Sequence, residues 1–208
     1  MKSIEINNFD LIKSLLTFPS EDVYYFLQII CRKKDSERHS SNQKTIKTYF
    51  ITSKDHLERI EPQVIELCTL FCARAYISPQ SKSFKRTALI NIEQLSSLLL
   101  KKQAVSIPSA LSTSAGKCPT FNKIYLVDID SKNNRYINEV LRFIETSCKP
   151  EGNKFLLSVP TVQGIHLLVK PFDVGTFTRQ YPDIDVHKNN PTLLYFNNKY
   201  CQEIPKVW

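Results

Sequence analysis

Apolar residues recur along this chain with two periods, one typical of helices and one typical of strands. Helical spacing predicts two short helices within residues 1–30 and further helices over 62–74, 88–102 and 136–146. Alternating or continuous apolar runs predict strands over 48–53, 73–78, 123–130, 155–159, 165–172, 183–187 and 192–196. We therefore expect an α/β (α+β) fold, with a mixed or antiparallel sheet in the second half and a mostly helical N-terminal half.

Two polar stretches divide the chain. Residues 32–47 are charged and predict an exposed loop, and residues 103–122 are rich in Ser and Pro and predict a longer one. The longer loop separates an N-terminal region, 1–102, which carries a basic segment, from a C-terminal core, 123–208. We expect the region and the core to form one compact unit.

Two hairpins are expected inside the core. The strands 155–159 and 165–172 are joined by a short connection with Gly164 at or near the turn. A positive φ is cheap only for glycine, which explains a glycine at that place. The strand 192–196 is expected to pair back on 183–187 across the Asn-Asn-Pro turn before it.

Composition indicates a folded protein with an anionic partner. The chain of 208 residues is 42% hydrophobic and 11% aromatic, and its formal net charge is +8. That excess favours nucleic acid as the partner. No apolar run is long enough to span a bilayer, no signal peptide is evident, and the six cysteines show no zinc-site spacing. We therefore expect a cytoplasmic protein without a membrane partner.

A basic, hydroxyl-rich segment lies near the middle of the chain. Arg74, Lys82, Lys85 and Arg86 are candidate contacts for nucleic acid in and before this segment. A solvated loop explains the same charges, so both readings stay open.

The strand 123–130 ends in two carboxylates, Asp128 and Asp130. Because side chains alternate along a strand, these two share one face. Neighbouring carboxylates repel each other, and a hard divalent cation such as Mg²⁺ or Mn²⁺ relieves that repulsion. The alternative is two solvated acids at a strand end.

Two later strands carry further polar side chains. His166 and Lys170 share one face of the strand after Gly164, which suits an anion, although a strand histidine is also common in a structural role. Asp183, Asp185 and His187 alternate with apolar residues in the strand 183–187. Any of these three is a candidate functional residue.

The order of these signals resembles that of the archaeo-eukaryotic primase superfamily, especially its PrimPol branch. The matching residues are Asp128 and Asp130 for a D-x-D motif, Thr161, Gly164 and His166 for an S/T-x-x-G-x-H motif, and Ile184 with Asp185 for a hydrophobic-Asp motif. The resemblance covers about the last third of the chain. Val162 stands where many PrimPol enzymes have a first glycine, and no zinc-ribbon cysteines occur.

The resemblance implies a metal-dependent nucleotidyltransferase of the DNA primase and polymerase type. It implies Asp128, Asp130 and Asp185 as Mg²⁺ or Mn²⁺ ligands and His166 as the contact for the incoming nucleoside triphosphate, with Gln163, Gly164 and Lys170 beside it. A single-stranded or primed template is the expected partner. Because no helicase module is evident, we expect a helicase or another replication partner in trans, and a phage or mobile element as the source. The alternatives are a catalytically silent nucleic-acid-binding protein of the same fold and a metal-dependent nuclease.

Overall fold

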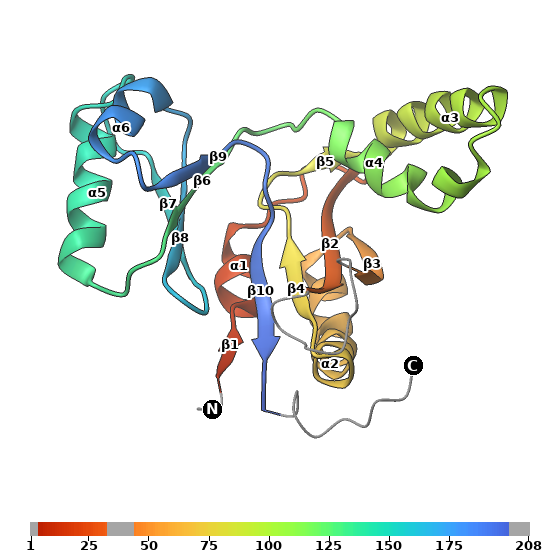
Figure 1. Ribbon diagram of the computed structural model, residues 1–208, viewed down its shortest axis with the longest axis horizontal. Coiled ribbons are helices and arrows are strands. Elements are labelled where there is room, and N and C mark those ends of the chain that lie inside the picture. The colour runs from red at the N-terminus through yellow and green to blue at the C-terminus, as the bar shows by residue number, and fades with distance from the viewer. Residues whose placement is uncertain (1–3, 33–43, 200–208) are drawn as a thin grey trace.

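The structure is a computed structural model that describes residues 4–32 and 44–199. It confirms an α+β fold with antiparallel sheets. Figure 1 shows three parts: a central sheet with its helices, a second sheet beside it, and a helical arm that extends from the opposite side. Most of the predicted loop 32–47, and the end of the predicted core from residue 200, lie outside the described residues.

The first sheet has the strand order β1-β10-β4-β2-β3, and β5 pairs with the start of β2. Its strands are β1 (Glu5–Asn7), β2 (Val23–Cys31), β3 (Lys44–Ile51), β4 (Arg74–Ile77), β5 (Lys82–Ser83) and β10 (Thr192–Asn197). Helices α1 (Phe9–Leu15) and α2 (Lys54–Phe71) share its main core. The N-terminal half therefore supplies most of a sheet as well as helices.

Strand β2 replaces a predicted helix. The apolar positions 23, 26, 27 and 30 fit a helical period, yet these residues form a strand between β3 and β4. Seven of its nine residues are buried, so both of its faces are covered and no polar alternation marks it as a strand. The prediction of a second N-terminal helix was wrong for this reason.

The second sheet has the order β7-β8-β6-β9 and is antiparallel throughout. Its strands and the two helices between them follow one another along the chain as β6 (Tyr125–Ile129), α5 (Asn134–Thr146), β7 (Phe155–Pro160), β8 (Ile165–Val169), α6 (Val174–Gln180) and β9 (Asp185–His187). This β-α-β-β-α-β order is the ferredoxin-like arrangement. Helices α5 and α6 pack on one face of the sheet around Val127, Ile129 and Leu167.

The opposite face of the second sheet packs into the main core. Leu126, Val159 and Leu168 from this face join the core that α1 and α2 form with the first sheet. Two buried amides also tie the sheets together. Asn8 Nδ2 donates to the carbonyls of Pro160 and Leu193, and Gln80 Nε2 donates to those of Ile124 and Lys188. The two sheets therefore form one unit.

Strand β10 does not form the predicted hairpin with β9. It leaves the second sheet and lies between β1 and β4 in the first. The predicted loop 103–122 is also largely helical, with a 3-10 helix, η2 (Ala104–Ser109), and α4 (Ala110–Lys117). These two and α3 (Phe84–Leu100) make up the helical arm.

Candidate functional site

A pocket of about 260 Å³ lies where the second sheet meets the ends of β2 and β4. The second sheet contributes Leu126, Asp128, His166 and His187, the first sheet and its continuation contribute Ile30, Arg32 and Tyr76, and the connection between β9 and β10 contributes Asn190 and Pro191. The pocket therefore has one wall with a carboxylate and two histidines and a facing wall with an arginine and a tyrosine.

Three residues of the resemblance come together on the second sheet. Asp128 on β6 lies directly opposite His166 on β8 and directly opposite Asp185 on β9. Directly opposed residues on antiparallel strands point to the same face, with Cβ atoms roughly 4.5–5.5 Å apart. Asp130 follows at the end of β6, on the same face by alternation. The two sequence-distant motifs thus flank the D-x-D strand on both sides.

His166 is held from the first sheet. Its Nδ1 lies 2.9 Å from the hydroxyl of Thr192 on β10, which is fully buried. Its Nε2 lies 3.5 Å from Asp128 Oδ1. When the Thr192 hydroxyl donates to Nδ1, the ring proton sits on Nε2 and faces the carboxylate side of the pocket.

Burial keeps His166 neutral. Loss of solvation, together with a smaller electrostatic effect of the neighbouring His187, lowers the pKa of His166 to about 4. At neutral pH the contact between His166 and Asp128 is therefore not an ion pair, despite its geometry. A neutral imidazole that carries its proton on Nε2 is a hydrogen-bond donor to an anion in the pocket.

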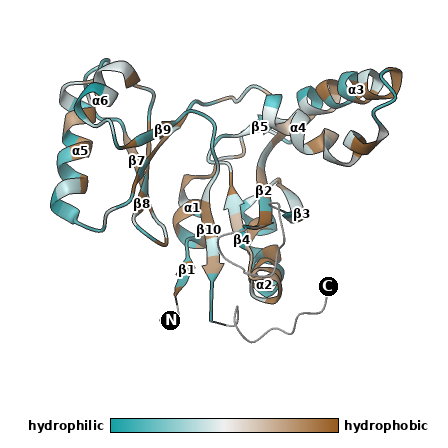
Figure 2. Cartoon of the chain, in the orientation of Figure 1, coloured by the Kyte–Doolittle hydropathy of each residue, from teal (hydrophilic) through white to brown (hydrophobic). Residues whose placement is uncertain are grey.

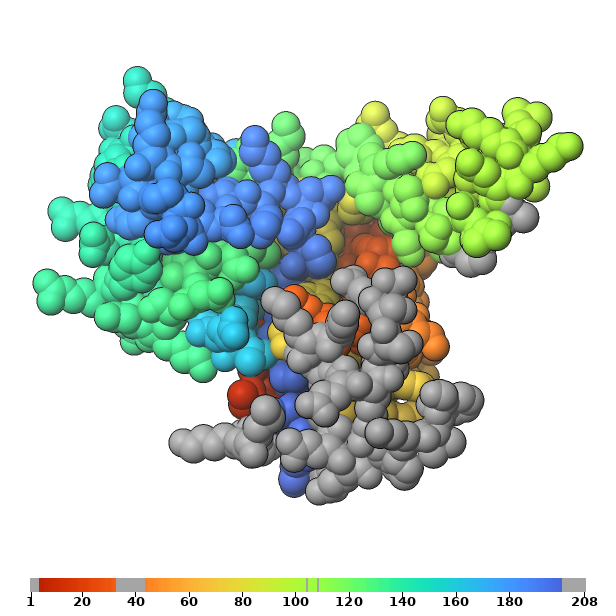
Figure 3. All heavy atoms as spheres, in the orientation of Figure 1, coloured from red at the N-terminus to blue at the C-terminus, as the bar shows by residue number. Residues whose placement is uncertain are grey.

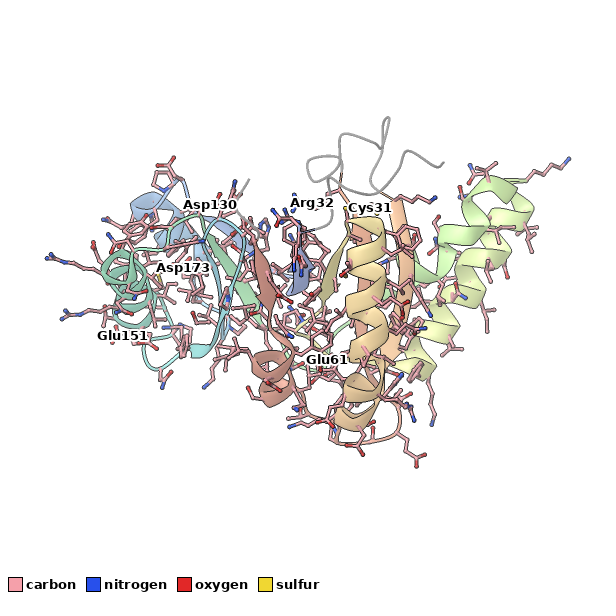
Figure 4. The ribbon with its side chains drawn as sticks, turned by 90° about the horizontal axis from the view of Figure 1, so that it is seen from below. Cys31, Arg32, Glu61, Asp130, Glu151 and Asp173 are labelled. Atoms are coloured by element: carbon pink, nitrogen blue, oxygen red, sulfur yellow. The ribbon has the colours of Figure 1, made fainter. Side chains whose placement is uncertain are left out.

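The surroundings of Asp128 disfavour the charged form of its carboxyl group. Burial raises its pKa, and the nearby Asp130 and Asp185 raise it further, while His187 and Arg32 lower it. Arg32 approaches from the other sheet, and its Nη1 donates to the Tyr76 hydroxyl at 2.9 Å. Figure 4 shows Arg32 and Asp130 on the same side of the molecule, each at the end of its strand.

Gly164 joins the second motif to the first through close packing. A Cβ atom at this position would lie 1.9 Å from the Ile129 carbonyl oxygen and 2.9 Å from the Asp130 Cα. Its φ is not positive, so the turn-geometry explanation of this glycine was wrong. The turn is closed instead by Thr161, whose Oγ1 accepts from the Gly164 amide at 3.0 Å. Glycine is needed because the turn touches the backbone of the D-x-D strand.

The residue types of the site suit a hard divalent cation, but their arrangement does not form a complete metal site. Asp128, Asp130 and Asp185 offer carboxylate oxygens on one face, and the charges of Asp130 and Asp185 add to the burial that raises the pKa of Asp128. Within residues 4–32 and 44–199, however, no group of three or more His, Cys, Asp or Glu side chains is arranged to hold a metal ion. The chemistry of the site fits Mg²⁺ or Mn²⁺, and a closed three-ligand geometry is not formed.

Among the predicted nucleotide contacts, His166 lines the pocket, whereas Gln163, Gly164 and Lys170 do not. Lys170 follows β8 at the end opposite His166, about 13 Å along the strand, and its Nζ lies 3.5 Å from the Asn153 carbonyl. Lys170 thus lies away from the pocket lining, and its contact with the same anion as His166 stays a prediction. Gln163 is exposed on the turn between Thr161 and Gly164, beside the end of β6.

The predicted basic segment is remote from this pocket. Lys82 is 3% exposed, and its Nζ donates to the carbonyls of Ala115 and Cys118. Lys82 is thus structural and is removed from the predicted nucleic-acid surface. Lys85 and Arg86 are exposed at the start of α3, next to the first residue of β2. Arg32 follows the far end of that strand, about 30 Å from its first residue.

Arg74 keeps its place as a candidate contact. It lies on β4 two residues before Tyr76, so both side chains share the face of the first sheet that lines the pocket. Its guanidinium stacks 4.5 Å from the centre of the Phe196 ring.

Sequence reasoning missed Arg32, Tyr76, Asn190 and Thr192. Arg32 lies at the start of a charged stretch, and Thr192 lies in an apolar strand assigned to the wrong sheet. No local pattern distinguishes these residues, because their roles depend on the contact between the two sheets. His187, a candidate in the sequence, does line the pocket, whereas Asp183 lies before β9 and does not.

The chain was compared with family models, curated proteins and solved structures, and none of them matches it. The resemblance to the primase superfamily therefore stays a prediction from this chain's own residues. In the part of the chain that the structure describes, no helix is long and apolar enough to cross a membrane. The five described cysteines are all buried.

Proposed function

We propose that the protein is a primase-polymerase-like nucleotidyltransferase that acts on nucleic acid with a divalent metal ion. The observation that carries this proposal is the position of Asp128 between His166 and Asp185, in register on neighbouring strands and beside a pocket. The three motifs are far apart in the sequence, and a resemblance in order alone does not require them to converge.

In nucleotidyl transfer, the 3′-hydroxyl of a primer attacks the α-phosphorus of a nucleoside triphosphate. A phosphodiester bond forms, the bond from the α-phosphorus to the bridging oxygen breaks, and pyrophosphate leaves. Divalent ions would polarise the hydroxyl, whose proton would pass to water, and would neutralise the charge of the leaving pyrophosphate. In this chain, Asp128, Asp130 and Asp185 are the residues to hold them.

The remaining pocket residues suit the triphosphate. His166 is fixed by Thr192 through Nδ1, so its protonated Nε2 is the donor of a hydrogen bond to a phosphate oxygen. Arg32 on the facing wall supplies positive charge on a rigid, always protonated group. The net charge of +8 supports binding of a single-stranded or primed template.

Extension of a labelled primer, with Mn²⁺ and all nucleotides present, tests the proposal. We expect wild type to extend the primer and Asp185→Asn to abolish extension. Asp183→Asn is the matched control, because it makes the same change two residues away, before β9 begins and outside the pairing of β9 with Asp128. Equal loss of extension in both variants contradicts the assigned role of Asp185.

A second candidate is a catalytically silent nucleic-acid-binding protein of the same fold. The lack of a three-ligand metal group among the described residues favours it. In this case wild type binds the primed template but does not extend the primer, and Mn²⁺ and nucleotides do not change its melting temperature. Shortening of the labelled primer, with wild type but not with Asp185→Asn, indicates a metal-dependent nuclease instead.

A further inference from the structure

The helical arm, residues 84–117, exposes aliphatic side chains on the face that points away from its own packing. Leu89, Ile92, Leu99 and Leu100 of α3 are 62–85% exposed, and Val105 of η2 is 95% exposed. Positions 89, 92, 96 and 99 follow the 3-4-3 spacing of a coiled-coil seam, with Ser96 at one of its places. Figure 2 shows brown segments along this arm, and Figure 3 shows that the arm protrudes from the body.

The other face of α3 already has a partner. Asn91 and Gln94 both accept from Ser114 of α4, at 3.2 and 3.4 Å, and Ser114 is fully buried. The exposed aliphatic stripe therefore lies on the outer side of an assembled hairpin. A contiguous apolar surface of this kind is typical of a protein interaction site.

Charge indicates what covers the stripe. The exposed charges of the arm are Lys85, Arg86, Lys101, Lys102 and Lys117, against the single acid Glu93. Pairing of two arms brings like charges together, which is unfavourable. Single-stranded nucleic acid prefers aromatic platforms on which bases stack, and the stripe on α3 is aliphatic. The surface that covers the arm is therefore expected to be apolar, with acidic residues around it.

Helix α2 carries such a surface. A groove of about 490 Å³ on its outer side is lined by Glu58, Glu61, Pro62, Ile65 and Glu66, and Leu70, one turn further, is 54% exposed. Glu58 is engaged by Lys13 at 2.8 Å, whereas Glu66 is exposed. Figure 1 shows α2 below the central sheet and the arm at the upper right, and Figure 4 shows Glu61 on α2.

We propose that the arm of one copy of this chain docks on the α2 groove of a second copy. The aliphatic stripe covers Pro62, Ile65 and Leu70, and the basic residues of the arm lie beside Glu61 and Glu66. The two surfaces are different, so the contact is head-to-tail and each added copy leaves one arm and one groove available. Association then grows with concentration, and salt weakens it because charge pairs contribute.

Sedimentation without metal, nucleotide or nucleic acid tests the contact independently of the proposed enzyme activity. We expect the mass of wild type to rise above the 24.1 kDa of one chain as concentration increases. Arg86→Glu with Lys101→Glu, and separately Glu61→Lys with Glu66→Lys, should each stay monomeric. A mixture of the two variants should associate again, because each reversed surface then meets its complement. Arg135→Glu with Arg142→Glu on α5 is the matched control and should associate like wild type.

Leu99→Gln with Leu100→Gln tests the apolar part, and these exposed positions leave the core unchanged. We expect this variant to remain monomeric. The proposal is overturned by monomeric wild type at every concentration, or by charge-reversed variants that still associate alone. Normal self-association of the arm variant together with a selective loss of nucleic-acid binding makes nucleic acid the occupant, and also overturns it.

Discussion

Substitution of Gly164 by alanine probes the contact that joins the two halves of the candidate site. The ideal Cβ would lie 1.9 Å from the Ile129 carbonyl oxygen, 2.6 Å from the Ser131 nitrogen and 2.9 Å from the Asp130 Cα. Ordinary contact begins near 3.4 Å. The turn and the end of β6 must therefore separate by roughly 1.5 Å, and every atom in the way belongs to the backbone.

The expected cost follows from this geometry. Overpacking of a well-packed site lowers the free energy of unfolding by about 1–3 kcal/mol, and a clash with backbone on both sides belongs at the upper end. For a chain of 150–250 residues, each kcal/mol changes the melting temperature by about 2–4 °C. We expect Gly164→Ala to melt about 6–12 °C below wild type.

Gly116→Ala is the matched control for this prediction. The same methyl group is added within α4, where no atom lies within 4 Å of the new Cβ and no positive φ is required. Alanine in a helix is more stable than glycine by roughly 0.5–1 kcal/mol, so this variant should melt at or slightly above the wild-type temperature. Thermal unfolding followed by circular dichroism measures both. Equal melting temperatures for the two variants would refute the close packing of Gly164 on the D-x-D strand.

Three further outcomes follow from the site. The pKa of His166 is lowered from 6.5 to about 4, so the unfolded chain binds a proton at a higher pH than the folded chain does. The free energy of unfolding should therefore fall by about 3 kcal/mol as pH drops from 6.5 to 4. Denaturant titrations of His166→Gln should show a smaller decrease over the same pH range. Lys82→Met should lower the free energy of unfolding by about 1–3 kcal/mol and leave the nucleic-acid affinity unchanged in a fluorescence-anisotropy titration, because Lys82 Nζ serves only buried carbonyls. Mn²⁺ at about 100 times its dissociation constant should add about 2.7 kcal/mol to the stability of wild type, seen as a higher melting temperature, and Asp128→Asn with Asp130→Asn should lose that gain.

Local patterns in the sequence determined much of the second sheet. The strands β6, β7 and β8, and helix α5 between them, lie close to the predicted ranges. Alternation along β6 correctly put Asp128 on the face opposite Val127 and Ile129, which pack against α5 and α6. Each of these segments has one face in a core, so its period reports its own burial and needs no knowledge of distant residues.

Tertiary structure decided the identity of β2 and the place of β10. The run from Val23 to Cys31 is buried on both faces, so its apolar positions fit a helix and a strand equally well. Its strand form depends on pairing with β3 and β4. For β10 the strand itself was predicted, but its neighbours β1 and β4 are set by packing across the whole chain.

The candidate site divides in the same way. The sequence indicated Asp128, Asp130, His166 and Asp185 as a set, because each lies in a recognisable strand or turn. Only the meeting of the two sheets brought Arg32 and Tyr76 to the pocket and the Thr192 hydroxyl to the ring of His166. It also showed that Lys82 is buried and that Gly164 is needed for a close backbone contact. The pattern of apolar residues gives the period of buried positions within one segment. Which other segment covers those positions depends on contacts between residues that are far apart in the chain.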